Sequence, residues 1–329
     1  MKVVITGGAG FLGLGVARQL LKRGTLAGPG GKPETIDEMV LFDAAIPKKK
    51  PAGLDGRAKM LAGDIADRDQ ARALIDRDEI VVFHLASVVS AGAERDFDGA
   101  LRVNLKGTRN VLEALRARRG ARRPRLVFAS SVAVYGGALP AAVSDATRET
   151  PATTYGMTKA IGELLVNDYA RKGFVDGRSA RLPTVIVRPG PANAAASGFA
   201  SAVFREPLAG RDYALPVKPS TRIMVLGARN AVAGLIRLME ADAAALGHDR
   251  AVALPNRAYS VEQMIAALEK VAAEKRIRLG AIRPAPDAGV EAIVGSWPLA
   301  MDDARARALG LPADDNLERI VRDYLEDAA

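Results

Sequence analysis

The chain has 329 residues, 49% hydrophobic and 26% charged, ordinary values for a folded globular protein that exclude extended disorder. It has no cysteine, which excludes disulfides, thiol catalysis and cysteine metal sites, and we predict no metal site. The net charge of +9 comes mostly from arginines scattered among alanines rather than from a nucleic-acid motif, so we predict no nucleic-acid partner; the positive charge would suit an acidic substrate.

The first half of the chain alternates short apolar runs with helix-like patterns, beginning with a strand and not with the apolar region of a signal peptide. Ile80–Leu85 is nearly all apolar, as expected for a strand buried on both faces. The alternation predicts an α/β fold with a doubly wound parallel sheet, a Rossmann fold. The expected strands are 2–6, 38–42, 58–62, 80–85, 125–129 and 184–187, and the expected helices are 11–23, 70–75, 102–116 and 155–172.

Other stretches depart from this rhythm. Thr25–Asp37 is rich in Gly and Pro and is interpreted as a surface insertion. After about Pro189 the elements become less regular. Ser260 and Gln263 fit a capping box that opens a helix over Val261–Lys275, and an amphipathic helix is expected over Asn316–Glu326. No run of about 18 apolar residues occurs, so we expect no membrane span and a cytoplasmic location.

A glycine-rich segment, Gly7-Gly8-Ala9-Gly10-Phe11-Leu12-Gly13, follows the first strand and opens the first helix. Gly7 permits the tight turn, Gly10 lets the backbone approach a pyrophosphate, and Gly13 lets the helix pack closely on the strand. Free N–H groups at the helix N-terminus attract phosphate. The segment therefore predicts dinucleotide binding, with Phe11 and Leu12 beside the ligand.

Asp43 ends the second strand, where an acid can bond both ribose hydroxyls of the adenosine and repel a 2′-phosphate. This favours NAD over NADP, although the insertion lengthens its spacing from the glycine turn and Lys48–Lys50 nearby would suit NADP. Further cofactor contacts are expected after the third and fourth strands, at Asp64, Ile65, Leu85, Ala86 and Ser87.

Tyr155 and Lys159 are four residues apart, which places them on one face of a helix. Ser131 lies just past the strand 125–129, at the carboxyl end of the sheet, where ligands of such sheets bind. Oxidation of an alcohol needs a base for the hydroxyl proton, and a nearby ammonium group stabilises the phenolate form of a tyrosine. We therefore expect Tyr155 to act as the base, Lys159 to stabilise it and to hold the nicotinamide ribose, and Ser131 to orient the substrate oxygen.

Gly7–Gly13, Asp64, Ser130–Gly136, Tyr155–Lys159 and Arg188-Pro189-Gly190 together resemble the extended short-chain dehydrogenases, the group that includes nucleotide-sugar epimerases. Longer stretches are similar to the D-erythronate dehydrogenase family, which oxidises the 2-hydroxyl of a four-carbon sugar acid to the 2-keto acid with NAD. The resemblance spans nearly the whole chain and implies an NAD-dependent oxidoreductase acting on a small sugar acid. The longer stretches are 155–169, 174–179, 181–184, 188–197 and 205–210.

The resemblance also implies residue roles. Asn104 would support the active-site lysine, and Pro189 would lie near the cofactor. Arg222 could pair bidentately with a substrate carboxylate, or it could be an ordinary surface arginine. His84 is expected to be a strand residue and not a catalyst. The expected substrate contacts are Ser87, Ser90, Ser131, Tyr155, Asn193, Ser197 and Arg222.

Two alternatives remain open. A nucleotide-sugar epimerase on the same scaffold would keep NAD bound and rotate a keto intermediate. A non-catalytic dinucleotide-binding sensor would not need the Ser, Tyr and Lys set. A 4,6-dehydratase is disfavoured because Val132 and Ala133 stand where it needs an acid and a base.

For domain organisation we expect an NAD-binding Rossmann domain over residues 1–188 and mainly a smaller C-terminal α/β substrate-binding cap over residues 189–329. Late strands and a helix near 221–256 are expected to return to the first domain. The resemblance further implies a homodimer that pairs through the helices 102–116 and 155–172.

Overall fold

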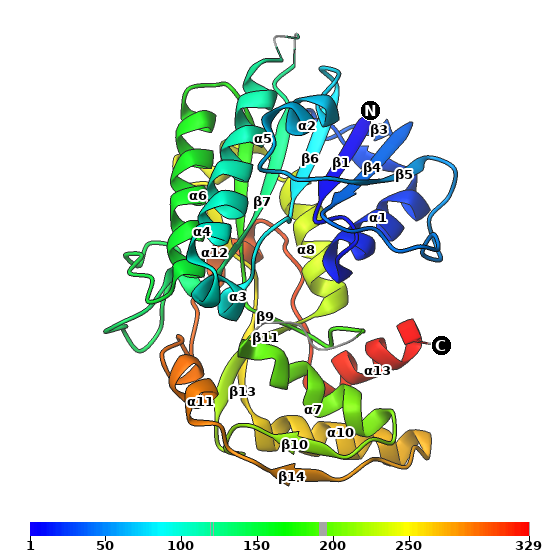
Figure 1. The fold of residues 1–329 in the computed structure, drawn as a ribbon, viewed down its shortest axis with the longest axis vertical. Coiled ribbons are helices and arrows are strands. Elements are labelled where there is room, and N and C mark those ends of the chain that lie inside the picture. Colours follow the sequence, from blue (N-terminus) through cyan, green and yellow to red (C-terminus); the bar gives the residue numbers. More distant parts are fainter. Residues whose placement is uncertain (119, 121, 191–195, 329) are drawn as a thin grey trace.

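The computed structural model describes residues 1–329 except 119, 121, 191–195 and 329, and it has two lobes (Figure 1). Within the described residues the upper lobe contains a seven-stranded sheet in the order β12-β8-β7-β6-β1-β4-β5, with every neighbouring pair parallel. This confirms the predicted doubly wound α/β fold. The strands are β1 (Lys2–Thr6), β4 (Glu38–Asp43), β5 (Ala58–Ala62), β6 (Ile80–His84), β7 (Arg125–Ser131), β8 (Asp176–Leu182) and β12 (Ala251–Ala253).

The strand order reverses direction beside β1. The chain runs outward from β1 to β4 and β5, then crosses back to β6 on the other side of β1. The carboxyl ends of β1 and β6 therefore flank the crevice where ligands bind in sheets of this kind.

Helices cover both faces of the sheet. On one face α1 (Phe11–Arg23) and α8 (Ala228–Glu240) bury Val16, Leu20 and Leu235 against β1 and its neighbours. On the other face α2 (Arg68–Leu74), α5 (Gly107–Arg116) and α6 (Thr154–Arg171) enclose a second core. Side chains of successive strand residues alternate between these two cores, so both faces of the strands are apolar.

Three local predictions are corrected by the structure. Thr25–Asp37 is more than a surface loop, because it forms the antiparallel hairpin β2 (Thr25–Ala27) and β3 (Pro33–Thr35) and buries Leu26 and Ile36 in the core. The expected helix 102–116 is divided: a π-helical turn, η1 (Leu101–Lys106), precedes α5. The strand β8 was not predicted.

The segment after β6 carries two short helices, α3 (Ser90–Arg95) and α4 (Phe97–Ala100), and a 3₁₀ turn, η2 (Val132–Val134), follows β7. The lower lobe begins with β9 (Thr184–Ile186), which pairs in parallel with β11 (Arg222–Gly227); β11 in turn pairs antiparallel with β13 (Arg257–Ser260).

The lower lobe has its own core, formed by α7, α10 and α13 around these strands. The helix α10 starts at Ser260 with the predicted capping box and spans the predicted residues. The remaining elements are η3 (Ala196–Gly198), α7 (Phe199–Leu208), β10 (Tyr213–Leu215), α9 (Ala243–Leu246), α10 (Val261–Lys275), β14 (Ile282–Pro284), α11 (Ala288–Gly295), α12 (Ala304–Ala308) and α13 (Leu317–Ala328).

After β11 the chain returns to the upper lobe, where α8 packs on α1 (Figure 1). The strand β12 then pairs with β8 at the edge of the sheet. Among the residues that the structure describes, no helix is both long enough and apolar enough to cross a membrane.

Candidate active site

The glycine turn lies between the carboxyl end of β1 and the start of α1. Gly7 has a φ of +70°, and a Cβ on it would stand 2.8 Å from the Ala86 backbone nitrogen. A Cβ on Gly13 would stand 2.5 Å from the Gly7 carbonyl oxygen, so the helix packs directly on the turn. The turn therefore exposes the N-terminus of α1 at the crevice between β1 and β6.

Asp43 stands at the end of β4 beside this turn. One carboxylate oxygen accepts a hydrogen bond from the Ala9 backbone N–H at 3.0 Å, and the other accepts from Ala44 N–H at 2.8 Å. The carboxylate is thus held at the position from which a Rossmann acid contacts the ribose of a dinucleotide.

The other predicted cofactor residues are spread around the same crevice. Asp64 follows β5, forms an ion pair with Arg102 and accepts from Ala66 N–H at 2.9 Å. Ile65 is buried against Gly107. Leu85, Ala86 and Ser87 follow β6, Phe11 and Leu12 open α1 facing the core, and Pro189 is exposed after β9.

Ser131, Tyr155 and Lys159 meet beyond the carboxyl end of β7. Ser131 lies close enough to the Tyr155 hydroxyl to lower the pKa of this phenol. Lys159, one turn further along α6, is 2% exposed, and its Nζ lies 5.4 Å from the centre of the Tyr155 ring and 4.8 Å from the centre of the Phe128 ring. The spacing of the tyrosine and the lysine in the sequence thus places both beside the serine.

The local sequence explains why α6 starts here. Thr153 caps the helix by accepting a hydrogen bond from Gly156 N–H at 3.0 Å. A Cβ on Gly156 would lie 2.1 Å from the Ala133 carbonyl oxygen, so the first turn of α6 rests on the backbone that follows Ser131. Glycine at this position brings the tyrosine within reach of the serine.

Burial shifts the protonation of both Tyr155 and Lys159 toward their neutral forms. Burial raises the pKa of the Tyr155 phenol to about 12, against the opposing effects of the Ser131 hydrogen bond and the positive charge of Arg188. Burial lowers the pKa of Lys159 to about 7, against the opposing charge of Glu163. A cation bound beside the phenol would shift the Tyr155 pKa back down.

Asn104 lies on the π-helical turn and connects three segments. Its Oδ1 accepts from Val88 N–H at 2.8 Å and from the Ser87 hydroxyl at 3.1 Å. Its Nδ2 donates to the Val88 carbonyl and to the Thr158 hydroxyl, each at 3.0 Å. On α6, Asn104 therefore contacts Thr158, the residue before Lys159, whereas the resemblance implies a contact with the lysine itself.

The structure brings some of the predicted substrate residues together and keeps others apart. Ser90 and Ser197 come together, because the Ser90 hydroxyl accepts from Ala196 N–H at 3.3 Å and Ser197 accepts from Arg188 Nη2 at 3.3 Å. Arg222 does not join them: its side chain is exposed and donates to the Ala258 carbonyl of β13 at 3.0 Å. Asn193 lies outside the described residues.

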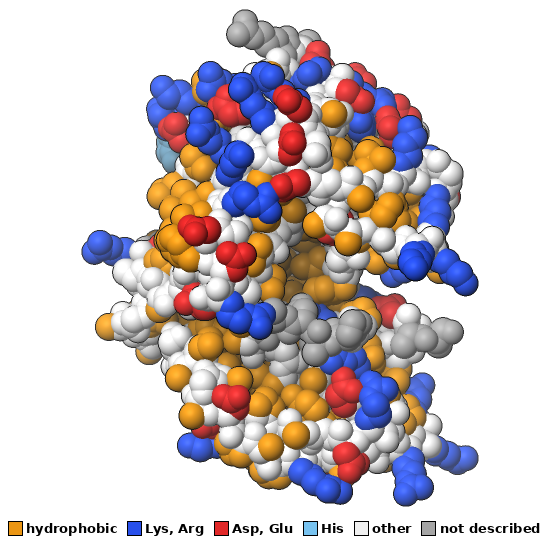
Figure 2. All heavy atoms as spheres, viewed as in Figure 1, with side chains coloured by type: hydrophobic (Ala, Val, Ile, Leu, Met, Phe, Trp, Pro, Cys, Tyr) orange, Lys and Arg blue, Asp and Glu red, His pale blue; other side chains and the backbone are white. Residues whose placement is uncertain are grey.

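Arg188 is not among the residues that the sequence predicts for the site. Its positive charge lowers the pKa of Tyr155, and it lies between α7 and the turn η3. The signal available in the sequence was its place directly after an apolar strand. Figure 2 shows a hollow between the two lobes with hydrophobic side chains at its back.

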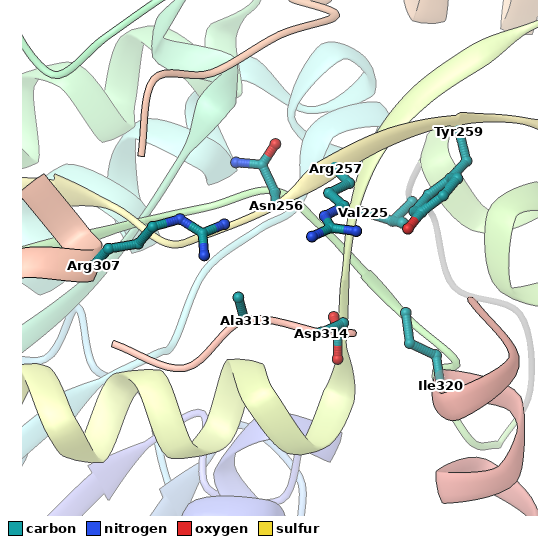
Figure 3. A pocket seen from close by; sticks show the side chains of 8 residues that line it. All are labelled: Val225, Asn256, Arg257, Tyr259, Arg307, Ala313, Asp314 and Ile320. Atoms are coloured by element: carbon teal, nitrogen blue, oxygen red, sulfur yellow. The ribbon is translucent and has the colours of Figure 1, made fainter. Parts of the chain in front are cut away.

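A separate small pocket lies between β11, β13 and the segment before α13. In Figure 3 the guanidinium groups of Arg257 and Arg307 point into the space above Asp314. Its volume of about 10 Å³ is the room of a single water. Asp314 accepts from Gly227 N–H at 2.6 Å and Asn230 Nδ2 at 2.7 Å at the start of α8, so this pocket reflects helix capping and has no room for a nucleotide.

Comparison with known proteins matches residues 3–251 to the NAD dependent epimerase/dehydratase family. The chain belongs to this family. The family is NAD dependent, so NAD is the cofactor, and the dehydrogenase relatives described next indicate an oxidoreductase acting on CH–OH groups.

Relatives of known name cover the chain from end to end. It is 48% identical over 329 residues to a D-erythronate dehydrogenase of Cupriavidus necator, covering 100% of this chain and 99% of the relative. It is 37% identical over 326 residues to a D-erythronate dehydrogenase of Haemophilus influenzae, with 99% of each covered. Among solved structures, a nucleoside-diphosphate-sugar epimerase from Agrobacterium tumefaciens is 40% identical with a TM-score of 0.89, over 99% of this chain and 94% of that one.

The residues present fit the cofactor of this family. The turn at Gly7 and Gly13 leaves no room for a Cβ, and the Asp43 carboxylate is fixed beside it. Asp43 carries a negative charge where NADP would place a phosphate, which agrees with NAD. Gly7, Gly10, Gly13 and Asp43 would hold the adenosine diphosphate half, and Tyr155 and Lys159 would face the nicotinamide half.

Proposed function

We propose that the protein oxidises the 2-hydroxyl of a small sugar acid, D-erythronate, to 2-keto-D-erythronate. The observation that supports this most directly is that Ser131, Tyr155 and Lys159 lie close together at the carboxyl end of the sheet, beside the glycine turn. The end-to-end similarity to two D-erythronate dehydrogenases favours this substrate over other alcohols.

In the proposed reaction Tyr155 removes the hydroxyl proton and Ser131 orients the same oxygen. NAD, when bound, accepts the hydride and supplies a positively charged ring next to the phenol. From a pKa of about 12 in the cofactor-free protein, a phenol that works near neutral pH needs about 7 kcal/mol of preferential stabilisation of its phenolate form. Arg188 supplies part of that stabilisation as a cation in a dry site, and Lys159 adds to it in its protonated form.

The direct test is the formation of NADH by the purified protein with D-erythronate, L-threonate and a series of uronates. We expect D-erythronate to give the highest kcat/KM. Tyr155→Phe should reduce kcat by about 10²–10⁴-fold, the usual effect of losing a general base, and leave NAD affinity unchanged. Tyr169→Phe, on the same helix with its hydroxyl bonded to Glu113, is the matched control and should keep full activity.

Two other results would point to the alternative functions. NAD that stays bound through purification, with turnover of a nucleotide sugar and none of any acid, would favour the epimerase suggested by the Agrobacterium tumefaciens structure. NAD binding without turnover of acids or nucleotide sugars would favour a sensor.

We also propose a cytoplasmic homodimer that pairs through the outer faces of α5 and α6. The side chain of Leu164 on α6 is 65% exposed and would be buried in such an interface. A monomeric mass by light scattering would reject the dimer.

A further inference from the structure

Arg188 is fixed beside the catalytic residues by its own backbone. Its N–H donates to the Ser201 hydroxyl at 3.1 Å, and its carbonyl accepts from Arg205 Nη1 at 3.2 Å. Both partners lie on α7, so the helix that opens the lower lobe holds the end of β9 in place. The position of Arg188 is thus set independently of any ligand.

The guanidinium group reaches back toward the upper lobe. Its Nη2 donates to Ser197, whose neighbour Ala196 donates to the Ser90 hydroxyl at the start of α3. The positive charge of Arg188 also acts on the Tyr155 phenol. A basic group and two hydroxyl groups from separate segments therefore face one another near the catalytic tyrosine.

Two arginines, Arg188 and Arg205, lie close together in this corner of the site. Burial lowers the pKa of Arg188, and the neighbouring charge of Arg205 lowers it further. Glu206 accepts from Arg205 Nε at 2.8 Å and from Arg211 Nε at 2.8 Å, so this carboxylate is shared between two arginines. A bound anion would further stabilise cations that lie close together in a buried site.

We propose that Arg188 binds the carboxylate of the hydroxy-acid substrate, with the Ser197 and Ser90 hydroxyls beside it, while Tyr155 and Ser131 hold the hydroxyl group on the adjacent carbon. The proposal rests on the proposed function, since it assigns the acid group of that substrate. The carboxyl carbon and the reacting carbon are directly bonded, so the cation that binds the carboxylate must lie near the catalytic base. A guanidinium fork matches a carboxylate in two parallel hydrogen bonds.

The experiment compares D-erythronate with D-erythronamide, whose neutral amide replaces the carboxylate, in the wild type, Arg188→Gln and Arg188→Lys. Arg188→Gln should raise the KM for D-erythronate by about 100-fold, the scale for removing one partner of a buried charge pair. The KM for the amide should hardly change. Arg188→Lys keeps the charge but loses the fork, and its KM for the acid should be intermediate.

The matched control is Arg250→Gln. Arg250 is also a half-buried arginine, but it donates to the Gly177 carbonyl at 2.6 Å at the start of β8, the end of the strand away from the site. Its substitution should leave the acid-to-amide preference unchanged. An Arg188→Gln enzyme whose KM rises by the same factor for acid and amide would overturn the proposal, whereas a fall in kcat shared by both substrates would reflect the charge lost beside Tyr155.

A second measurement separates this proposal from the proposed function. Oxalate binding to the enzyme–NADH complex, followed by the fluorescence of bound NADH, requires no turnover. If no hydroxy acid is oxidised but oxalate binds to the wild type and at least about 100-fold more weakly to Arg188→Gln, the function fails and the carboxylate site stands. Oxalate that binds both proteins equally, or neither, overturns the site.

Discussion

Thr6 Oγ1 and His84 Nδ1 lie 2.6 Å apart at the adjoining ends of β1 and β6. On the other side of the ring, Nε2 lies 2.9 Å from the Thr108 hydroxyl, which donates to the Asn104 carbonyl at 2.6 Å. A hydroxyl has one proton, so Thr108 must accept from His84 and the ring carries its proton on Nε2. Thr6 then donates to Nδ1 and accepts from Ala86 N–H at 3.3 Å. This buried chain connects the glycine turn with Asn104.

From this series of hydrogen bonds we predict that His84 is a positioning residue. His84→Leu removes one of the two hydrogen-bond partners of each hydroxyl, Thr6 and Thr108, at about 1–3 kcal/mol each, and should lower both stability and kcat. His84→Gln supplies one acceptor and one donor and should restore most of the kcat. Urea unfolding and steady-state kinetics measure the two effects. His248→Gln, at the exposed second histidine, is the control, and equal kcat values for His84→Leu and His84→Gln would contradict the prediction.

His84 also predicts how stability depends on pH. Burial, and then the charge of Lys159, lower its pKa to about 3 from an unfolded value of about 6.5. The unfolded chain therefore binds the extra proton first, and stability is fully present above the unfolded pKa and is lost as pH falls toward the folded pKa. Between pH 7.5 and 5.5 the histidine should cost about 1.4 kcal/mol of unfolding free energy. Over this pH range the unfolding free energy of His84→Gln should fall by about 1.4 kcal/mol less than that of the wild type. An identical fall in both proteins would assign the pH dependence to other groups.

We expect Asp43 to affect both the choice of cofactor and the conformation of the glycine turn, because its carboxylate accepts a hydrogen bond from Ala9 N–H in that turn. Asp43→Asn keeps the shape and removes the charge. The Kd for NAD should rise about 10–100-fold, the effect of losing charge-assisted hydrogen bonds, and discrimination against NADP should fall. Titration with both cofactors measures this. An unchanged preference for NAD would show that another group reads the ribose.

The buried pair Glu163–Arg181 predicts a large loss of stability. Arg181 is 2% and Glu163 1% exposed, and Arg181 Nε lies 3.1 Å from both carboxylate oxygens. Glu163→Gln removes the fully buried carboxylate and leaves Arg181 with the ion pair to Glu149, so it should cost about 3 kcal/mol, the lower end for breaking a buried pair. The control is Asp168→Asn, whose exposed ion pair with Arg171 lies on the same helix and should contribute less than about 1 kcal/mol. Chemical denaturation of both variants gives the comparison, and similar losses would refute the prediction.

The elements with a strong local pattern agree with expectation. The helix Phe11–Arg23, the strand Ala58–Ala62 and the helix Val261–Lys275 have the predicted bounds. Their ends carry local signals, such as Gly24 in the left-handed region and the Ser260 capping box, which need no distant partner.

The strand β8 shows why other elements escaped prediction. Its residues Arg178, Ser179 and Arg181 look like a surface segment, yet all three are buried. Arg181 is stabilised by Glu163 from α6, and Arg178 donates to the Met239 carbonyl at the end of α8 at 2.6 Å. Such partners are distant in sequence, so only the assembled fold reveals that the charges are satisfied.

The sequence by itself determined the Rossmann architecture, the glycine turn, Asp43 and the Tyr155–Lys159 spacing, because each depends on neighbours within a few residues or on simple periodicity. The tertiary structure alone decided which arginine faces the catalytic tyrosine. Arg222 seemed suited to a carboxylate, but strand pairing turns it to the exposed side of β13, whereas Arg188 is held near Tyr155 by α7. Side-chain surroundings depend on contacts between segments far apart in the chain, and those contacts exist only in the folded molecule.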